Sequence, residues 1–173
     1  FITSASCMSH QRRHQEKILQ IATGYESYQR YWDVSTIFHH HRYHENATKF
    51  TIAIAFTNEE IRPEHHTKPI CFANQRTPGP SKYVEPKFDL FGYGKSVILE
   101  KTILDRIDTT CEAPFICAKS SITDGDCMAE GSPIVRSIEE APYFQVIGII
   151  ADKQKYCTSG TGTFIRLSDP EIV

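Results

Sequence analysis

The chain has little of what membrane-spanning and nucleic-acid-binding proteins need. Its 173 residues include 19 Lys or Arg and 21 Asp or Glu, a formal net charge of −2, so it offers no basic surface for a phosphate backbone. No apolar run approaches the roughly 20 residues that cross a bilayer, and the sequence does not open with a basic head followed by an apolar stretch. We therefore expect a soluble protein with no signal peptide in this sequence, no membrane span and no nucleic-acid partner.

Stretches rich in alanine or leucine are also scarce, which argues against a helical bundle. Nine Gly, nine Pro and 11% aromatic residues favour short strands joined by turns, and 40% hydrophobic residues suffice for a core. Strands are predicted in eight segments: 18–22, 34–38, 51–56, 88–91, 97–102, 134–137, 144–150 and 163–167. Residues 9–17 and 101–109 are candidates for helical turns, although neither has a sustained apolar stripe. This spacing of strands is typical of an all-β sandwich or barrel.

A proline-rich segment divides the chain. Residues 62–86 hold five of the nine prolines, as expected for an extended connector between two halves. We therefore predict a first β-barrel over residues 1–68, an interdomain connector over 69–86 and a second β-barrel over 87–173.

The six cysteines include no Cys-x-x-Cys pair, which favours disulfides over zinc. Asn46-Ala47-Thr48 is a glycosylation acceptor in a polar stretch between two apolar segments. A three-residue acceptor is a weak signal alone. Together with the cysteines, it predicts a secreted protein with a glycan at Asn46.

Several short motifs follow one another along the chain. They are Thr3-Ser4-Ala5-Ser6-Cys7, Ile37-Phe38-His39-His40-His41-Arg42-Tyr43, Thr51-Ile52-Ala53-Ile54-Ala55, Pro69-Ile70-Cys71, Gly92-Tyr93-Gly94, Ile116-Cys117-Ala118, Cys127-Met128-Ala129-Glu130-Gly131-Ser132-Pro133 and Gly162-Thr163-Phe164-Ile165-Arg166-Leu167-Ser168. In this order and at these distances they resemble the trypsin/chymotrypsin family of serine proteases, over nearly the whole chain. The resemblance implies two six-stranded antiparallel Greek-key β-barrels. It also implies truncated termini, because the chain begins inside the first barrel and stops before the family's terminal helix.

The resemblance places the family's catalytic histidine, aspartate and serine on Ser6, Thr51 and Gly131. The last position is counted from Cys127, because the loop is one residue shorter than the family's Cys-Gln-Gly-Asp-Ser-Gly-Gly-Pro. Acyl transfer needs a hydroxyl nucleophile, an imidazole that takes its proton and a carboxylate that orients the imidazole. Losing one member typically costs on the order of a millionfold in turnover. We therefore expect no peptidase activity.

The former substrate cleft is altered as well. The shortened loop redirects the N–H groups that form the family's oxyanion hole. Glu130 replaces the family's buried aspartate, and Ser132 replaces a glycine when the loop is counted back from Pro133. The residues that the resemblance assigns to this cleft are Gly125, Asp126, Glu130, Ser132, Ala151, Asp152 and Lys153.

The resemblance also implies disulfide pairings. It implies one bond between Cys111 and Cys117 and another between Cys127 and Cys157. The family counterparts of Cys7 and Cys71 bond to cysteines that would lie upstream of Phe1. The alternative is a bond between Cys7 and Cys71.

The eight histidines have two interpretations, as metal ligands or as polar surface residues. Adjacent histidines on a strand point to opposite faces, so only His39 and His41 of the triplet could face one ion, and no cysteine or carboxylate spacing accompanies them. His40 matches a structural histidine of the family. His10 and His14 are interpreted as a solvated loop face. We expect neither a metal nor a cofactor.

The sequence thus predicts a secreted serine-protease homologue without peptidase activity that works as a binding or regulatory module. Its expected partners are proteins, such as components of protease cascades or of a larger assembly. One alternative is a divergent peptidase that uses Ser132 with a rearranged base such as His10, with an apparent pKa of about 6 to 7 in its pH–rate profile. The other is a structural component of a large assembly.

Overall fold

A computed structural model describes residues 1–12, 19–24, 28–45, 48–65, 67–72, 87–93, 99–107, 111–120, 128–138, 141–151 and 161–172. In these ranges the chain forms one helix and eleven strands. They are β1 (Ile2–Ser4), α1 (Ala5–Arg12), β2 (Gln20–Thr23), β3 (Arg30–His39), β4 (Ile52–Thr57), β5 (Cys71–Phe72), β6 (Lys87–Tyr93), β7 (Leu99–Arg106), β8 (Phe115–Ser120), β9 (Pro133–Ile138), β10 (Ala141–Ile150) and β11 (Thr161–Arg166). The predicted all-β class is confirmed. No helix among these residues is long and apolar enough to cross a membrane.

Each of the eight predicted strands overlaps an observed one, whereas β1, β5 and β8 were not predicted. The helical turn predicted at 101–109 is wrong, because residues 99–106 form β7, which pairs with β6 and β8. The other helical prediction is displaced. The helix begins at Ala5, directly after β1, and residues 13–17 lie outside the described ranges.

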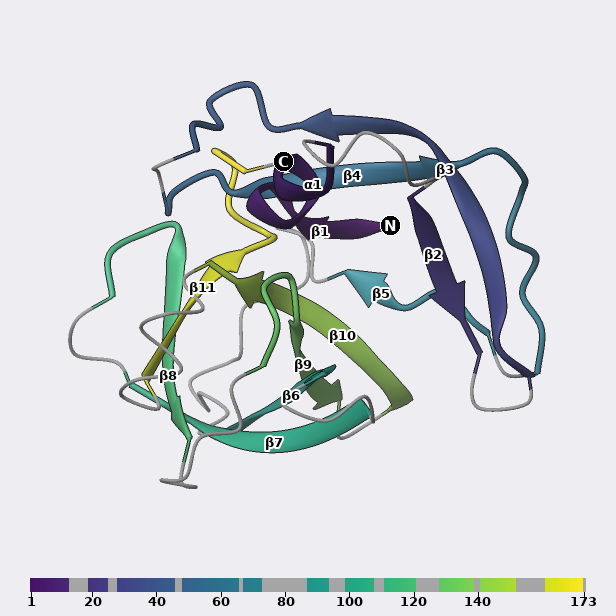
Figure 1. Cartoon of the computed structure of the whole chain (residues 1–173). Helices are drawn as coiled ribbons and strands as arrows, with labels where there is room; N and C mark the ends of the chain where they lie inside the picture. Colours follow the sequence, from purple (N-terminus) through teal and green to yellow (C-terminus); the bar gives the residue numbers. More distant parts are fainter. Residues whose placement is uncertain are drawn as a thin grey trace.

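The C-terminal half closes into an antiparallel barrel of six strands in the order β11-β8-β7-β6-β9-β10, with the pairing of β10 and β11 completing the ring (Figure 1). Alternation along the strands fills its interior, as in β6, where Phe88 and Leu90 are buried. The other buried members of this core are Leu104, Ile116, Ala118, Met128, Ile134, Ile147, Ile150 and Phe164. The short strand β5 adds to the barrel alongside β10, in parallel.

The N-terminal half shows part of the predicted first barrel. Its described residues form a four-stranded antiparallel sheet in the order β1-β4-β3-β2. No pairing between β1 and β2 closes this sheet, so both remain edges in the described part of the chain. The described residues thus form a closed barrel joined to a half-barrel sheet, which agrees with a chymotrypsin-like double barrel.

A second apolar cluster joins the two halves. Ile52 of β4 packs with residues of the C-terminal barrel, including Val146 and Ile149 of β10 and Ile165 of β11. After β11 the chain crosses back towards the N-terminal half (Figure 1), where Lys49 Nζ lies 3.0 Å from Glu171 Oε2. These contacts bring the start of α1 and the start of β4 against the loop that precedes β9.

Candidate functional site

A row of hydroxyl groups crosses the junction between the two halves. Thr51 Oγ1 lies 2.9 Å from Ser4 Oγ, and Ser4 Oγ lies 2.6 Å from Ser6 Oγ. Ser6 Oγ then donates to Glu130 Oε2 of the C-terminal half at 2.5 Å. Ser4 and Thr51 are buried, whereas Ser6 and Glu130 are half-buried at the outer end. This hydrogen-bonded row joins residues that are 47 and 124 positions apart.

Gly131 is the third of the positions, with Ser6 and Thr51, that the sequence analysis aligned with catalytic residues, and it lies beside Thr3 and Ser4. Its φ of +81° is a conformation that residues with a side chain rarely adopt. A Cβ placed on it would lie 2.6 Å from Thr3 Oγ1 and 3.0 Å from the Ser4 main-chain nitrogen. Ser6, Thr51 and Gly131 therefore surround one small region, although they come from α1, the start of β4 and the loop before β9.

Ser132 occupies a different position from Gly131. Its side chain is buried, with 6% of its surface exposed, and packs against Gly92 of β6 so closely that a Cβ there would overlap Ser132 Oγ. Its main chain is held on both sides, because its N–H donates to Ala129 O at 3.1 Å and its C=O accepts from Ile150 N–H at 3.0 Å. Ser132 Oγ thus packs against β6.

The motif order, the closed barrel and this convergence agree with a family comparison. A family model described as Trypsin matches residues 1–170 of the chain. The chain belongs to the trypsin family. The resemblance found in the motifs is thereby confirmed. No individual curated protein matches the chain.

In this trypsin-family domain the hydrogen-bonded row contains hydroxyls from Ser4, Ser6 and Thr51 and one carboxylate, Glu130, which accepts a hydrogen bond directly from Ser6. The hydrogen bonds of this row can hold the two halves together at their junction.

The trypsin-family chain carries one disulfide in its described part, Cys111 to Cys117, with a Cα–Cα distance of 5.6 Å, as predicted. Cys7 is half-buried in α1 and Cys71 is exposed in β5; no disulfide joins these two described residues, so the alternative pairing is not found. Trypsin-family domains and disulfides are typical of extracellular proteins. The second predicted bridge, Cys127 to Cys157, lies outside the described residues.

Other predicted site residues divide between the described and undescribed parts of the chain. Ala151 is buried, and its N–H donates to Thr163 O at 2.9 Å, so it belongs to the pairing of β10 with β11. Outside the described residues lie Asn46, Gly125, Asp126, Asp152 and Lys153. Ser4 was not predicted as a member of the site. Ser4 lies in the motif that runs from Thr3 to Cys7, but nothing in that motif indicates its contact with Thr51.

His40 packs against the N-terminal half of this trypsin-family fold. His40 stacks on Phe50 with ring centroids 4.8 Å apart, and its Nε2 lies 3.0 Å from Glu171 O. Burial lowers the pKa of His40, and the neighbouring charges of His41 and Arg42 act in the same direction. The hydrogen bond and charge of Lys49 lower the pKa of Glu171. The described residues contain no cluster of three or more potential metal ligands.

Proposed function

We propose that this chain is an extracellular trypsin-family homologue without peptidase activity that acts as a binding or regulatory module for other proteins. The observation that carries the proposal is the row from Thr51 through Ser4 and Ser6 to Glu130. At the junction where the family assembles its catalytic groups, this chain assembles hydroxyls and one carboxylate. These groups hydrogen-bond to one another.

The chemistry of the row supports the absence of turnover. A serine hydroxyl is essentially unionised at neutral pH unless a base takes its proton. Ser6 donates its hydroxyl proton to a carboxylate, Glu130, and no imidazole takes part in the described row. The position of the family's nucleophile is Gly131, which has no side chain to attack with.

The position of Ser132 argues against the divergent peptidase. A nucleophile must reach the substrate and contact a base, and Ser132 Oγ is instead packed against β6. The base suggested for it, His10, has a side chain outside the described part of the structure.

The activity test uses a biotinylated fluorophosphonate, which labels activated serines, and a panel of peptide esters. We expect no labelling and no hydrolysis above buffer, with trypsin as the positive control and the Ser132→Ala variant as the matched negative. Stoichiometric labelling that Ser132→Ala abolishes would overturn the proposal in favour of a divergent peptidase.

Secretion and glycosylation are tested by expression in a eukaryotic secretory system. We expect a chain that loses apparent mass on treatment with peptide N-glycosidase, and an Asn46→Gln variant that does not change. A secreted wild-type chain whose mass is insensitive to the glycosidase would contradict the glycan at Asn46.

A further inference from the structure

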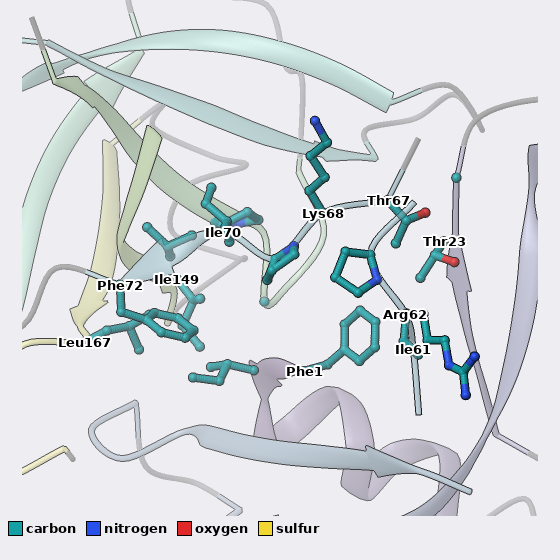
Figure 2. A pocket seen from close by; sticks show the side chains of 17 residues that line it. Phe1, Thr23, Ile61, Arg62, Thr67, Lys68, Ile70, Phe72, Ile149 and Leu167 are labelled. Atoms are coloured by element: carbon teal, nitrogen blue, oxygen red, sulfur yellow. The ribbon is translucent and has the colours of Figure 1, made fainter. Parts of the chain in front are cut away.

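The segment that follows β11 connects the C-terminal half to the N-terminal half. Residues 167–172, which we call the crossing segment, run from the barrel to the N-terminal half (Figure 1). Leu167 and Ile172 are buried in the apolar cluster that joins the two halves. Leu167 also lines a cavity of about 570 Å³, together with residues of β1 and β5 such as Ile2 and Phe72 (Figure 2). The crossing segment is therefore part of the junction.

Glu171 of the crossing segment makes two contacts with the N-terminal half. His40 Nε2 lies 3.0 Å from the Glu171 main-chain oxygen, and Lys49 Nζ lies 3.0 Å from Glu171 Oε2. Within the crossing segment, the N–H of Glu171 donates to Asp169 Oδ1 and the N–H of Ile172 donates to Asp169 O, each at 2.9 Å. These bonds form a turn that is attached to the N-terminal half at Glu171.

Two hydrogen bonds hold the ring of His40 in its neutral form. A carbonyl oxygen can only accept, so Nε2 must carry the proton that is donated to Glu171 O. The other ring nitrogen, Nδ1, lies 3.2 Å from the main-chain nitrogen of Arg42, whose N–H can only donate, so Nδ1 must be unprotonated. A second proton on His40 would set two donors against each other at Nδ1.

The main chain around His40 has little freedom to relieve that conflict. The N–H of His40 donates to Ile52 O at 3.0 Å, and the C=O of His40 accepts from the N–H of Tyr43 at 2.9 Å. Because these bonds fix the turn that presents the Arg42 N–H, the imidazole is the group that must move. Moving the imidazole breaks its hydrogen bond with Glu171.

Aromatic rings and cations surround His40. Its ring stacks on those of Phe50 and His41, with centroids 4.8 and 4.5 Å away. The guanidinium of Arg42 lies 5.4 Å from the centre of the Phe50 ring, and the ammonium of Lys49 lies 5.2 Å from it. A positive charge on His40 would therefore be added beside cations, which is unfavourable.

The pKa directions of both partners agree with this geometry. Burial, followed by the charge of His41, lowers the pKa of His40, and the hydrogen bond to Glu171 offsets only part of that effect. The hydrogen bond and charge of Lys49 lower the pKa of Glu171. A lowered pKa means that the folded contact binds fewer protons than the open one, so acid weakens it. The contact is strongest with a neutral His40 and an anionic Glu171.

We propose that His40 and Glu171 form a pH-sensitive contact that attaches the crossing segment to the N-terminal half at neutral pH and releases it in acid. When His40 takes up a proton, its imidazole leaves the Arg42 N–H and Glu171 O. Residues 169–172 then loosen while the barrel stays folded. This inference goes beyond the proposed function and does not depend on it, because its test includes no peptidase assay.

The experiment follows the isotope-labelled chain by NMR from about pH 7.5 down to the pH at which His40 is fully protonated. At the start we expect the neutral His40 ring with its proton on Nε2. As His40 titrates, the protection factor of the Ile172 amide, which is its exchange rate corrected for the intrinsic effect of pH, should fall about tenfold with the same midpoint. The amides of β10 should keep their protection.

Two variants separate His40 from other titrating groups. His40→Gln places an amide donor near the position of Nε2 but cannot take up a proton, so Ile172 should stay protected where the wild-type chain releases it. The matched control is His44→Gln, at an exposed histidine, and it should leave the release unchanged.

A third variant replaces His40→Gln if that variant does not fold, as judged by its urea midpoint. Because the charge of His41 lowers the pKa of His40, His41→Gln should move the midpoints of His40 and of Ile172 to higher pH together. A role of His40 in packing alone would not move them.

Four outcomes overturn the proposal. They are a His40 ring with its proton on Nδ1 at neutral pH, protection of Ile172 that does not change as His40 titrates, equal release in the wild type and a folded His40→Gln, and midpoints of His40 and Ile172 that separate in His41→Gln.

Discussion

Placing a serine at position 131 should destabilise the protein, because Gly131 occupies a site with little room for a side chain. Its φ of +81° disfavours any residue with a Cβ by about 1 kcal/mol. The added Cβ would lie 2.6 Å from Thr3 Oγ1 and 3.0 Å from the Ser4 main-chain nitrogen, and overpacking of this kind costs about 1–3 kcal/mol. We therefore expect Gly131→Ser to lower the free energy of unfolding by about 2–4 kcal/mol.

Urea unfolding followed by far-UV circular dichroism measures this loss. The matched control is Ala129→Ser, which adds a hydroxyl in the same loop at a residue without a positive φ. A second variant tests the contact itself. Combining Gly131→Ser with Thr3→Ala removes the hydroxyl nearest the new Cβ and should restore about 1 kcal/mol.

Two results would refute this reasoning. An unfolding midpoint of Gly131→Ser equal to that of the wild type would mean that the loop before β9 accepts a side chain. A double variant with Thr3→Ala that recovers nothing would mean that Thr3 does not limit the space.

Three other predictions concern stability. Ser6→Ala should cost about 1.5–3 kcal/mol, and in a double-mutant cycle with Glu130→Gln the two losses should not add, because one hydrogen bond with a charged acceptor is lost in both. Because burial lowers the pKa of His40 below its usual 6.5, the unfolded chain binds more protons there. Stability should therefore fall as pH drops below about 6.5 until the lowered pKa is passed, and His40→Asn should reduce this fall in urea midpoints. Replacing both Cys111 and Cys117 by serine opens a loop with a sequence separation of 6 and should cost about 2 kcal/mol.

Each of these predictions has its own control or contrary result. Additive losses in the cycle would show that Ser6 and Glu130 do not interact in solution. The control variant is His44→Asn, at an exposed residue near His40, and it should leave the pH dependence of the urea midpoint unchanged. An equal effect from His40→Asn and His44→Asn would rule out His40 as the cause. Wild-type protein treated with reductant should match the double serine variant, and an unchanged midpoint would mean that the bridge does not stabilise the fold.

Much of the fold was predictable from the sequence because its signals are local. The segment at 144–150 combines β-branched residues with flanking turn residues, and it became most of β10. Very short strands such as β5, with two residues, carry too little periodicity to predict. A helical turn was predicted at 101–109 without an apolar stripe to support it, whereas pairing with β6 and β8 makes residues 99–106 a strand.

By itself, the sequence determined the family and the all-β class, because motif order and spacing survive in the linear chain. Only the tertiary structure decided that Ser4, Ser6, Thr51 and Glu130 join in one hydrogen-bonded row, and that residues of β1 and β5 line one cavity. Contacts of this kind bring together residues up to 124 positions apart. They depend on how two sheets pack, and no local pattern of residue types encodes that packing.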